Sequence, residues 1–384
     1  MTKQRSVIIV GSAYPLRGGG IATFNERLAK EFVDLGYDTH IETFKLQYPS
    51  ILFPGKTQYS DEAPPENLKI EVSINSINPL NWIKIGKKIK KLKPDLVVMR
   101  FWIPFMAPCL GTIARIIRKN NITKVVAIVD NIIPHEKHYG DRLLANYFVK
   151  NVDAFVTMSR SVLAELETFD QAKPKKYTLH PLYDNFGDPI PKKEALAKLK
   201  LSEDFRYILF FGFIRQYKGL DLVFKAMAED WVKMQNIKLV VAGEFYSDSK
   251  PYFDLIKELN IGDRVILHND FIPNTEVVNF FCAADIVVQP YKTATQSGVT
   301  QVAYHFNKPM IVTNVGGLAE IVPHEKVGYV VDVDHREIAH ALKLFYENNS
   351  LPTFVENIAD EKKKYSWIKM IDVIESLHKA IIEK

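Results

Sequence analysis

The segment YILFFGFIRQYKG, Tyr207–Gly219, indicates the fold class of this chain and contains its most informative pair of charges. Ile208–Phe211 form an unbroken apolar run, as a strand buried on both faces of a parallel sheet requires. The run ends at a glycine, and an amphipathic helix is expected from about Gly219. Arg215 and Lys218 lie between them, at the end of a strand where open α/β sheets bind ligands. A guanidinium and an ammonium group beside a helix amino terminus favour an anion such as a diphosphate.

Apolar runs of strand length recur along the chain and alternate with helical patterns. This alternation predicts an α/β fold with parallel sheets covered on both faces. We expect strands at Ser6–Gly11, Thr39–Phe44, Leu68–Val72, Asp95–Arg100, Val125–Val129, Ala154–Met158 and Tyr177–His180, and then at Tyr207–Phe211, Lys238–Ala242, Val265–His268, Ile286–Gln289, Met310–Thr313 and Gly328–Val331.

The length of 384 residues suits two domains of similar size. Pro181–Pro191 has the proline, glycine and aspartate content of an exposed linker. We therefore expect one domain at residues 1–185 and a second at 192–364. A C-terminal helix at 365–384 is also expected, because its apolar residues recur at helical spacing.

The composition, 47% hydrophobic and 25% charged residues, is that of a globular protein. Cys109 and Cys282 lie far apart, which argues against a disulfide framework or a zinc site and favours a reducing compartment. The amino terminus does not have the pattern of a signal peptide, and no apolar stretch reaches the length of a membrane span. A cytoplasmic protein is expected.

Positive charge is concentrated in the first half of the chain. Residues 1–190 contain 26 Lys and Arg against 19 Asp and Glu, and much of the surplus lies in NWIKIGKKIKKLKP, residues 81–94. Four apolar residues recur at helical spacing and are expected on the inner face: Trp82, Ile85, Ile89 and Leu92. The opposite face is rich in lysine, and its candidates are Lys84, Lys87, Lys88 and Lys91. Such a face suits either an anionic membrane surface or plain solvent. Nucleic acid is not expected as a partner, because no aromatic residues are interleaved with the lysines.

Three glycines, Gly18, Gly19 and Gly20, directly precede the helix expected at Ile21–Leu35. Glycines allow positive φ and let a ligand approach main-chain N–H groups. The spacing from Gly11 does not fit the dinucleotide-binding fingerprint, so a phosphate or sugar loop is the expectation.

Ionisable residues follow the strand in AIVDNIIPHEKHYGD. Asp130 ends the strand and His135 lies in the following loop, where either side chain is a candidate to act on an acceptor hydroxyl. The alternative is that Asp130 caps the turn and that the histidines are only exposed. No residue spacing in this segment supports a metal site.

Further polar residues follow other strands of the second half. Gly243 and Glu244 follow one, and Ser297 with Gly298 precede the helix expected near Val299. Backbone N–H groups at that helix start are placed to receive an anion. Asp332 and Asp334 form a D-x-D sequence, but Asp334 is expected to cap the helix that begins at His335.

The ordered set GFIRQYKGLDLVFKAM, VVAGE, AADIVVQPY and KPMIVTNVGGLAEIV resembles the donor-binding half of a family four glycosyltransferase with the GT-B fold. RGGGIATFNERLAKEF resembles the amino-terminal glycine loop and helix of the same family. The resemblance implies two Rossmann-like domains with parallel sheets facing across a cleft. It assigns the acceptor to the domain at 1–185 and the nucleotide sugar to the domain at 192–364, and it implies that the helix at 365–384 returns to the first domain.

The resemblance also implies roles for single residues. Arg215 and Lys218 match the cationic pair that holds the donor diphosphate, and Gly18–Gly20 match a loop that lies against the donor. Glu320, in GGLAE, matches a family glutamate. Two further glutamates of the family fall here at Ala294 and Val302, so Ser297 and Gly298 are expected to supply the remaining donor contacts. The histidine that the family has after an amino-domain strand falls at Asp130.

The activity that this resemblance implies is transfer of a sugar from a nucleoside diphosphate sugar to an acceptor hydroxyl. Retention of configuration is expected, with no cofactor and no obligatory metal. The acceptor would be a glycan or lipid-linked glycan of cell-surface polysaccharide synthesis, at the inner face of the membrane. Two alternatives remain, because the paired glutamates are absent: a non-catalytic scaffold that binds nucleotide sugar, and a nucleotide-sugar epimerase.

Overall fold

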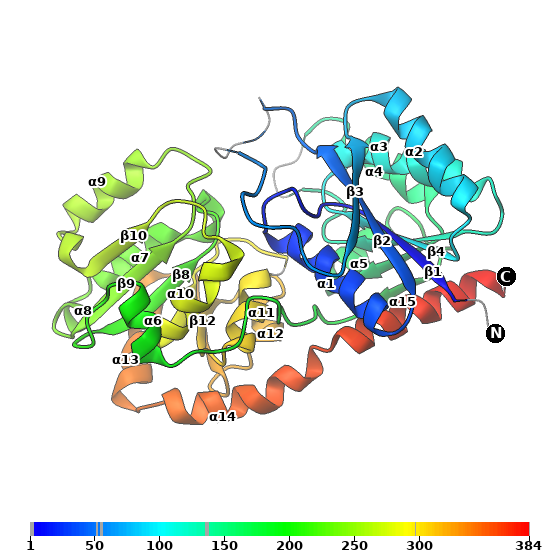
Figure 1. Cartoon of the computed structure of the whole chain (residues 1–384). Coiled ribbons are helices and arrows are strands. Elements are labelled where there is room, and N and C mark those ends of the chain that lie inside the picture. The colour runs from blue at the N-terminus through cyan, green and yellow to red at the C-terminus, as the bar shows by residue number, and fades with distance from the viewer. Residues whose placement is uncertain (1–3, 51–52, 54–56, 135–137, 296, 384) are drawn as a thin grey trace. The chain divides into compact units, whose positions relative to one another are not determined.

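The computed structural model describes residues 4–50, 53, 57–134, 138–295 and 297–383. The chain forms two compact units, each built on one parallel sheet. The N-terminal unit comprises Met1–Pro181 together with Tyr365–Lys384, and the C-terminal unit comprises Leu182–Lys364. In Figure 1 the N-terminal unit contains the blue and cyan segments and the red C-terminal helix, and the C-terminal unit contains the yellow and orange segments.

The sheet of the N-terminal unit has the strand order β3-β2-β1-β4-β5-β6-β7, and all its paired strands are parallel. Its strands are β1 (Ser6–Val10), β2 (Asp38–Leu46), β3 (Lys69–Asn75), β4 (Leu96–Phe101), β5 (Lys124–Val129), β6 (Ala154–Thr157) and β7 (Lys175–Tyr177). Its helices are α1 (Gly20–Asp34), α2 (Pro79–Leu92), η2 (Pro104–Met106), α3 (Ala107–Arg118), α4 (Asp141–Asn151), α5 (Arg160–Glu167) and α15 (Trp367–Ile382).

The sheet of the C-terminal unit has the order β10-β9-β8-β11-β12-β13 and is also parallel. Its strands are β8 (Arg206–Phe211), β9 (Ile237–Ala242), β10 (Val265–His268), β11 (Ile286–Gln289), β12 (Met310–Thr313) and β13 (Gly328–Val331). Its helical elements are α6 (Lys192–Lys198), η3 (Gln216–Lys218), α7 (Leu220–Met227), α8 (Asp230–Lys233), α9 (Lys250–Glu258), η4 (Gly262–Arg264), η5 (Asn274–Glu276), α10 (Val277–Ala283), α11 (Gly298–His305), α12 (Leu318–Ile321), α13 (His335–Glu347), α14 (Leu351–Glu361) and η6 (Lys362–Lys364).

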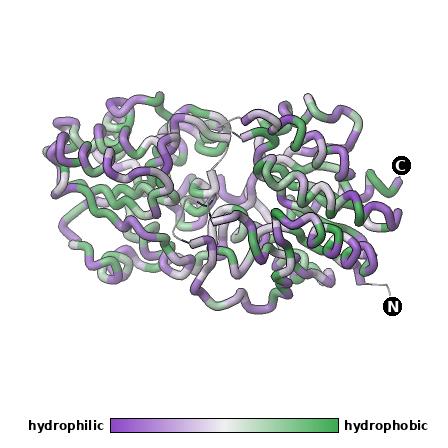
Figure 2. Tube along the Cα trace, turned by 90° about the horizontal axis from the view of Figure 1, so that it is seen from above, coloured by the Kyte–Doolittle hydropathy of each residue, from purple (hydrophilic) through white to green (hydrophobic). Residues whose placement is uncertain are grey.

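Each sheet lies inside its unit because its strands are apolar on both faces. All residues of β4, β11 and β12 are buried. Figure 2 shows hydrophobic residues concentrated along interior segments of each unit and hydrophilic residues on outer turns. Such strands require helices on both sides, and these helices leave the carboxyl ends of the strands as the place for a ligand.

The strand orders locate one switch point in each sheet. In the N-terminal unit the chain leaves β1 toward β2 and returns to its other side at β4; in the C-terminal unit β8 has β9 and β11 as its two neighbours. Ligands of open α/β sheets bind at the carboxyl ends of the strands beside such a point. In the C-terminal unit this position is occupied by the turn after β8.

The last helix, α15, completes the N-terminal unit. It contacts β5, β6, β7 and α1, and its Trp367 ring lies 4.9 Å from the ring of Phe24. Arg5, just before β1, donates a hydrogen bond to Glu375 at 2.5 Å. The helix therefore joins the domain in which the chain begins, as predicted.

The predicted fold class is confirmed: the chain has two Rossmann-like units with parallel sheets. Thirteen strands were expected, and each has its counterpart within a few residues. The largest displacement is at β7, which spans Lys175–Tyr177 where Tyr177–His180 was predicted. This edge strand includes two lysines, so apolar periodicity does not mark its position.

Candidate functional site

The turn after β8 is the centre of the candidate site in the C-terminal unit. Gly212 follows the strand with a left-handed φ of 99°, and Gly219 precedes α7 with a φ of 68°. A Cβ at Gly219 would stand 2.0 Å from the backbone oxygen of Pro290, in the segment after β11. Glycine is therefore required there both by backbone conformation and by the close approach of the neighbouring chain.

The Lys218 ammonium lies over Gly212 and beside an aromatic ring. A Cβ built on Gly212 would stand 3.2 Å from Lys218 Nζ, and Nζ is 5.6 Å from the centre of the Tyr291 ring. Burial, followed by the charge of Arg215, lowers the pKa of Lys218 to about 8. An anion bound at this position would favour the charged form of the lysine.

Arg215 lies on extended backbone, with φ −133° and ψ 154°, and its side chain is exposed. Its Cζ atom lies 5.3 Å from the centre of the Tyr246 ring. Within the described part of the chain, no carboxylate lies within ion-pair distance of Arg215 or Lys218. By contrast, the nearby Lys292 pairs with Asp221 at 2.9 Å. Two adjacent cations without a carboxylate partner favour an anionic ligand.

Gly243 and Glu244, which follow β9, contact the turn after β8. A Cβ on Gly243, φ 153°, would stand 2.2 Å from the backbone oxygen of Gly212. Glu244 is buried, and its backbone oxygen accepts a hydrogen bond of 2.8 Å from the N–H of Ile214. Both residues therefore lie beside the cationic turn, where Gly243 permits the close packing of the two strand ends.

Ser297 and Gly298 lie at the start of α11, which is also close to the turn. The Ser297 hydroxyl caps the helix by accepting from the N–H of Val299 at 3.2 Å, and it lies 3.3 Å from the hydroxyl of Tyr291. A Cβ on Gly212 would stand 3.7 Å from a methyl of Val299. The structure thus brings the ends of β8 and β11 and the start of α11 together around Lys218.

Ala294 and Val302, which stand where the family has glutamates, have different surroundings. The backbone oxygen of Ala294 would stand 1.6 Å from a Cβ built on Gly316, so this loop packs against the loop after β12. Val302 is buried within α11.

Glu320 is exposed in the first turn of α12. The Asp334 carboxylate accepts from the N–H of Arg336 at 2.7 Å, which confirms its predicted role as a helix cap.

The glycine loop of the N-terminal unit leads directly into α1. Gly19 has an extended φ of 165°, and its N–H donates to the hydroxyl of Thr23 at 3.2 Å. Left-handed φ, one of the two reasons predicted for glycine here, is therefore not observed at Gly19. Gly18 lies beside it, and Gly20 is exposed as the first residue of the helix.

Asp130 lies at the end of β5, as predicted, but its carboxylate is held by a residue that sequence reasoning missed. Arg100 on β4 donates to both carboxylate oxygens, at 2.5 and 2.6 Å, and lies 3.8 Å from the centre of the Phe24 ring. Burial raises the pKa of Asp130, and Arg100 opposes that shift. The Asp130 carboxylate therefore forms a buried ion pair, which neither sequence-based reading of this residue included. His135, the second candidate, lies outside the described residues.

Three of the four lysines proposed for a membrane surface lie on the outer face of α2. Lys84, Lys87 and Lys91 are exposed, and so are Leu80 and Ile83 on the same face. Over the described residues, no helix is long and apolar enough to cross a membrane.

Lys88 points into the N-terminal unit instead. Its ammonium donates to Glu42 on β2 at 2.5 Å and also to Glu71 on β3. Burial opposes ionisation of Glu42, but hydrogen bonds from His40, Lys88 and Ser73 hold its pKa below its ordinary value. We therefore leave Lys88 out of the membrane-facing set.

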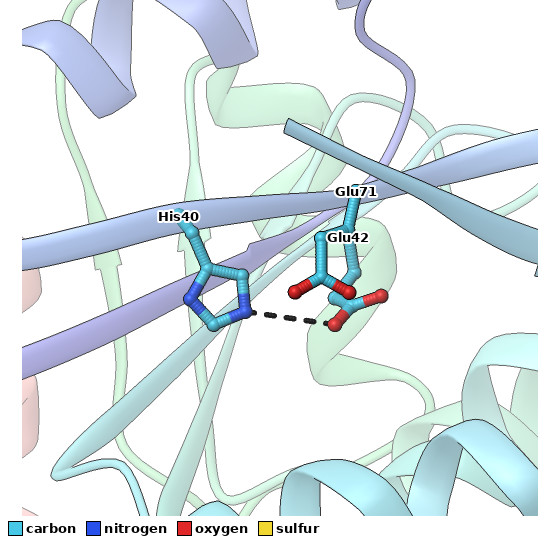
Figure 3. Close-up of side chains that lie close together, drawn as sticks. All are labelled: His40, Glu42 and Glu71. Atoms are coloured by element: carbon cyan, nitrogen blue, oxygen red, sulfur yellow. Dashed lines mark ion pairs between the residues drawn. The ribbon is translucent and has the colours of Figure 1, made fainter. Parts of the chain in front are cut away.

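His40, Glu42 and Glu71 form a cluster with metal-ligand chemistry (Figure 3). Their nearest ligand atoms lie within 4.8 Å of one another, and His40 Nε2 is 3.5 Å from the Glu42 carboxylate. Because Lys88 already supplies a cation to both carboxylates, a structural ion pair accounts for the cluster.

Comparisons with known proteins agree with this architecture. Residues 191–364 match the family model described as "Glycosyl transferases group 1". A D-inositol 3-phosphate glycosyltransferase of Catenulispora acidiphila is 24% identical over 67% of this chain and 59% of its own length. The match covers 47% of the length of a glycosyltransferase of Methanocaldococcus jannaschii. It covers 53% of the length of a D-inositol 3-phosphate glycosyltransferase of Thermobispora bispora.

Solved structures show the same fold over the whole chain. Sucrose-phosphate synthase from Thermosynechococcus elongatus has a TM-score of 0.72 at 17% identity, covering 99% of this chain and 100% of its own. Anabaena HepE, solved with UDP and glucose, has a TM-score of 0.70 at 15% identity, covering 98% of each chain. The chain thus has the GT-B fold, and its residues 191–364 are similar to the glycosyl transferases group 1 model.

Proposed function

We propose that this protein is a glycosyltransferase that moves a sugar from a nucleoside diphosphate sugar to an acceptor hydroxyl. The observation that carries the proposal is the pair Arg215 and Lys218. Both cations lie at the switch point of the C-terminal sheet, and neither is paired with a carboxylate among the described residues. This position and charge suit a diphosphate.

In the proposed reaction the two cations act on the leaving group. Cleavage of the bond between sugar and diphosphate increases negative charge on the diphosphate. Arg215 and Lys218 would stabilise that charge more strongly in the transition state than in the bound donor. We propose that they do so without a metal ion, since two side-chain cations are available. Retention of configuration is proposed from the family resemblance, and NMR of the first-formed product tests it.

The donor base is proposed by analogy with the fold neighbours. Anabaena HepE was solved with UDP and with UDP-glucose, so uridine nucleotides are the first to test. Gly18–Gly20 of the N-terminal unit are proposed to contact the donor. Gly243, Glu244, Ser297, Gly298 and Glu320 are proposed as further donor contacts; of these, Gly243, Glu244, Ser297 and Gly298 adjoin the cationic turn.

For the acceptor we propose a glycan or lipid-linked glycan, reached at a membrane surface. The support is the outer face of α2, which combines exposed Leu80 and Ile83 with Lys84, Lys87 and Lys91. An amphipathic helix of this kind binds anionic lipid through both its apolar and its cationic residues.

The test is a transfer and hydrolysis assay with UDP-sugars, comparing Arg215→Ala with Lys225→Ala. Lys225 is an exposed lysine in the last turn of α7 and serves as the matched control. We expect Arg215→Ala to lower turnover by about a hundredfold or more, as loss of a transition-state cation does, and the control to keep its activity. Binding without turnover would favour a scaffold, a role for which the absence of glutamates at 294 and 302 is the specific observation. Conversion of donor with no acceptor would favour an epimerase.

A further inference from the structure

A stack of aromatic rings lies beside the exposed guanidinium of Arg215. The ring of Tyr246 stacks on Phe213, with centres 4.3 Å apart and planes inclined by 27°. Phe213 in turn stacks on Phe271 at 6.4 Å and 29°. Arg215 Cζ lies 5.3 Å from the centre of the Tyr246 ring. Tyr246 therefore contacts both an aromatic neighbour and the cation proposed to bind diphosphate.

Backbone hydrogen bonds join the segments that follow β8 and β9 and so fix the positions of these side chains. The N–H of Ile214 donates to the oxygen of Glu244 at 2.8 Å, and the N–H of Tyr246 donates to the oxygen of Ile214 at 3.0 Å. Ile214 itself is fully buried. Because alternate residues of extended backbone point to the same side, Phe213 and Arg215 both project away from the core, where Tyr246 meets them.

We propose that Tyr246 is the positioning residue for Arg215, and that Phe213, which stacks on the Tyr246 ring, restricts the orientation of that ring. This inference rests on the proposed function, because it assumes that Arg215 binds the donor diphosphate. A guanidinium over an aromatic face is attracted by the ring and keeps its N–H donors free in its own plane. The ring thus restricts a long, exposed side chain to one region while its donors stay available to phosphate oxygens.

A different role for the same ring is contact with the nucleobase. The two roles predict different changes in ligand affinity when the ring is removed. A ring that acts through Arg215 affects any diphosphate, including inorganic diphosphate, which has no base. A ring that stacks on the base affects UDP but leaves inorganic diphosphate unchanged.

The experiment measures the affinity of the full-length protein for inorganic diphosphate and for UDP by calorimetry. The variants are Tyr246→Leu, Tyr246→Phe and Arg215→Ala, together with the double variant Arg215→Ala/Tyr246→Leu. The matched control is Tyr346→Leu, since Tyr346 has Arg206 Cζ at 4.9 Å from its ring centre, at the amino end of β8. Thermal unfolding of each variant confirms that it is folded.

We expect Tyr246→Leu to weaken both ligands by about threefold to thirtyfold, the range for one cation–π contact. Tyr246→Phe keeps an aromatic face and should stay within about twofold of the wild type. In the Arg215→Ala background, Tyr246→Leu should cause no further loss, because the two residues act as one unit. Tyr346→Leu should leave both affinities unchanged.

Three results would overturn the inference while leaving the proposed function intact. One is unchanged affinity for both ligands in Tyr246→Leu. Another is a loss in the Arg215→Ala background as large as in the wild type, and the third is a loss confined to UDP. If the wild type binds neither ligand, the proposed diphosphate site is itself wrong, and the inference is overturned with it.

Discussion

At the scale of single residues, the site depends on which charges have partners. Lys88 and Asp130 are neutralised by opposite charges in the N-terminal unit. Arg215 and Lys218 have no carboxylate partner among the described residues. This difference identifies the C-terminal pair as the candidate ligand site.

We predict that diphosphate binding weakens as pH rises through the pKa of Lys218. Burial lowers that pKa to about 8, so the free protein carries the charge below pH 8 and loses it above. Affinity for UDP-glucose, whose diphosphate keeps its charge over this range, should change little up to pH 7.5 and then fall by up to about tenfold per pH unit. Lys218→Arg should flatten the profile, because arginine stays protonated. Calorimetry from pH 6 to 10 measures both, and a flat wild-type profile would contradict the assignment.

We also predict that Asp130 is needed for stability. Asp130→Ala leaves Arg100 buried without its partner, which should lower the free energy of unfolding by about 3–5 kcal/mol. The double variant Arg100→Met/Asp130→Leu removes both charges and should recover most of that loss. Denaturant unfolding provides the comparison. If Asp130→Ala were as stable as the wild type but had no transfer activity, Asp130 would instead have a role in the reaction.

The sequence predicted part of this site, for reasons that particular residues make clear. Arg215 and Lys218 follow one strand directly, so their strand end and spacing are readable from the chain. Arg100 precedes Asp130 by 30 residues and Tyr246 follows Arg215 by 31, so neither pairing is visible before the strands are aligned. The alignment of β4 with β5 and of β8 with β9 brings these residues together.

At the scale of elements, helix α2 shows what apolar periodicity predicts and what it does not. Its apolar spacing correctly predicted a helix with Ile85 and Ile89 inside. It did not separate Lys88 from the other lysines, because that depends on Glu42 and Glu71 of the adjacent strands. Leu92, expected on the inner face, is exposed at the end of the helix.

We predict that α2 binds anionic vesicles through its outer lysines. Changing Lys84, Lys87 and Lys91 to Gln should weaken binding to vesicles of phosphatidylglycerol and phosphatidylcholine by about a hundredfold, at roughly 1 kcal/mol per lysine. The control changes three exposed lysines of the C-terminal unit, Lys225, Lys233 and Lys257, to Gln. Co-sedimentation with the vesicles measures both. An equal loss of vesicle binding in the two triple variants would show that α2 is not the membrane-binding element.

At the scale of the whole molecule, the chain closes its first unit only with its last helix. The apolar face of α15 was readable from the sequence, but its place beside β5, β6 and β7 became an expectation only through the family resemblance. Trp367, Met370, Ile371, Ile374 and Leu377 are all buried there. The N-terminal unit is therefore complete only when residues 365–384 are present.

Two isoleucines on α15 make this dependence testable. Ile371 is 3% exposed and Ile368 is 56% exposed. Ile371→Asp places a carboxylate in the apolar contact with the sheet and should cost about 3 kcal/mol or more. Ile368→Asp should change stability by less than about 0.5 kcal/mol. Calorimetric unfolding of both variants gives the comparison, and equal effects would mean that α15 does not complete the unit.

The measurement that tests the central claim most directly is a thermal-shift panel of nucleoside diphosphates on the wild type, Arg215→Ala and Lys225→Ala. A ligand that binds only the native state raises the melting temperature. We predict a clear shift with one nucleotide, retained in Lys225→Ala and lost in Arg215→Ala. No shift with any nucleoside diphosphate, or an equal shift in Arg215→Ala, would contradict the assignment of the turn after β8 as the diphosphate site.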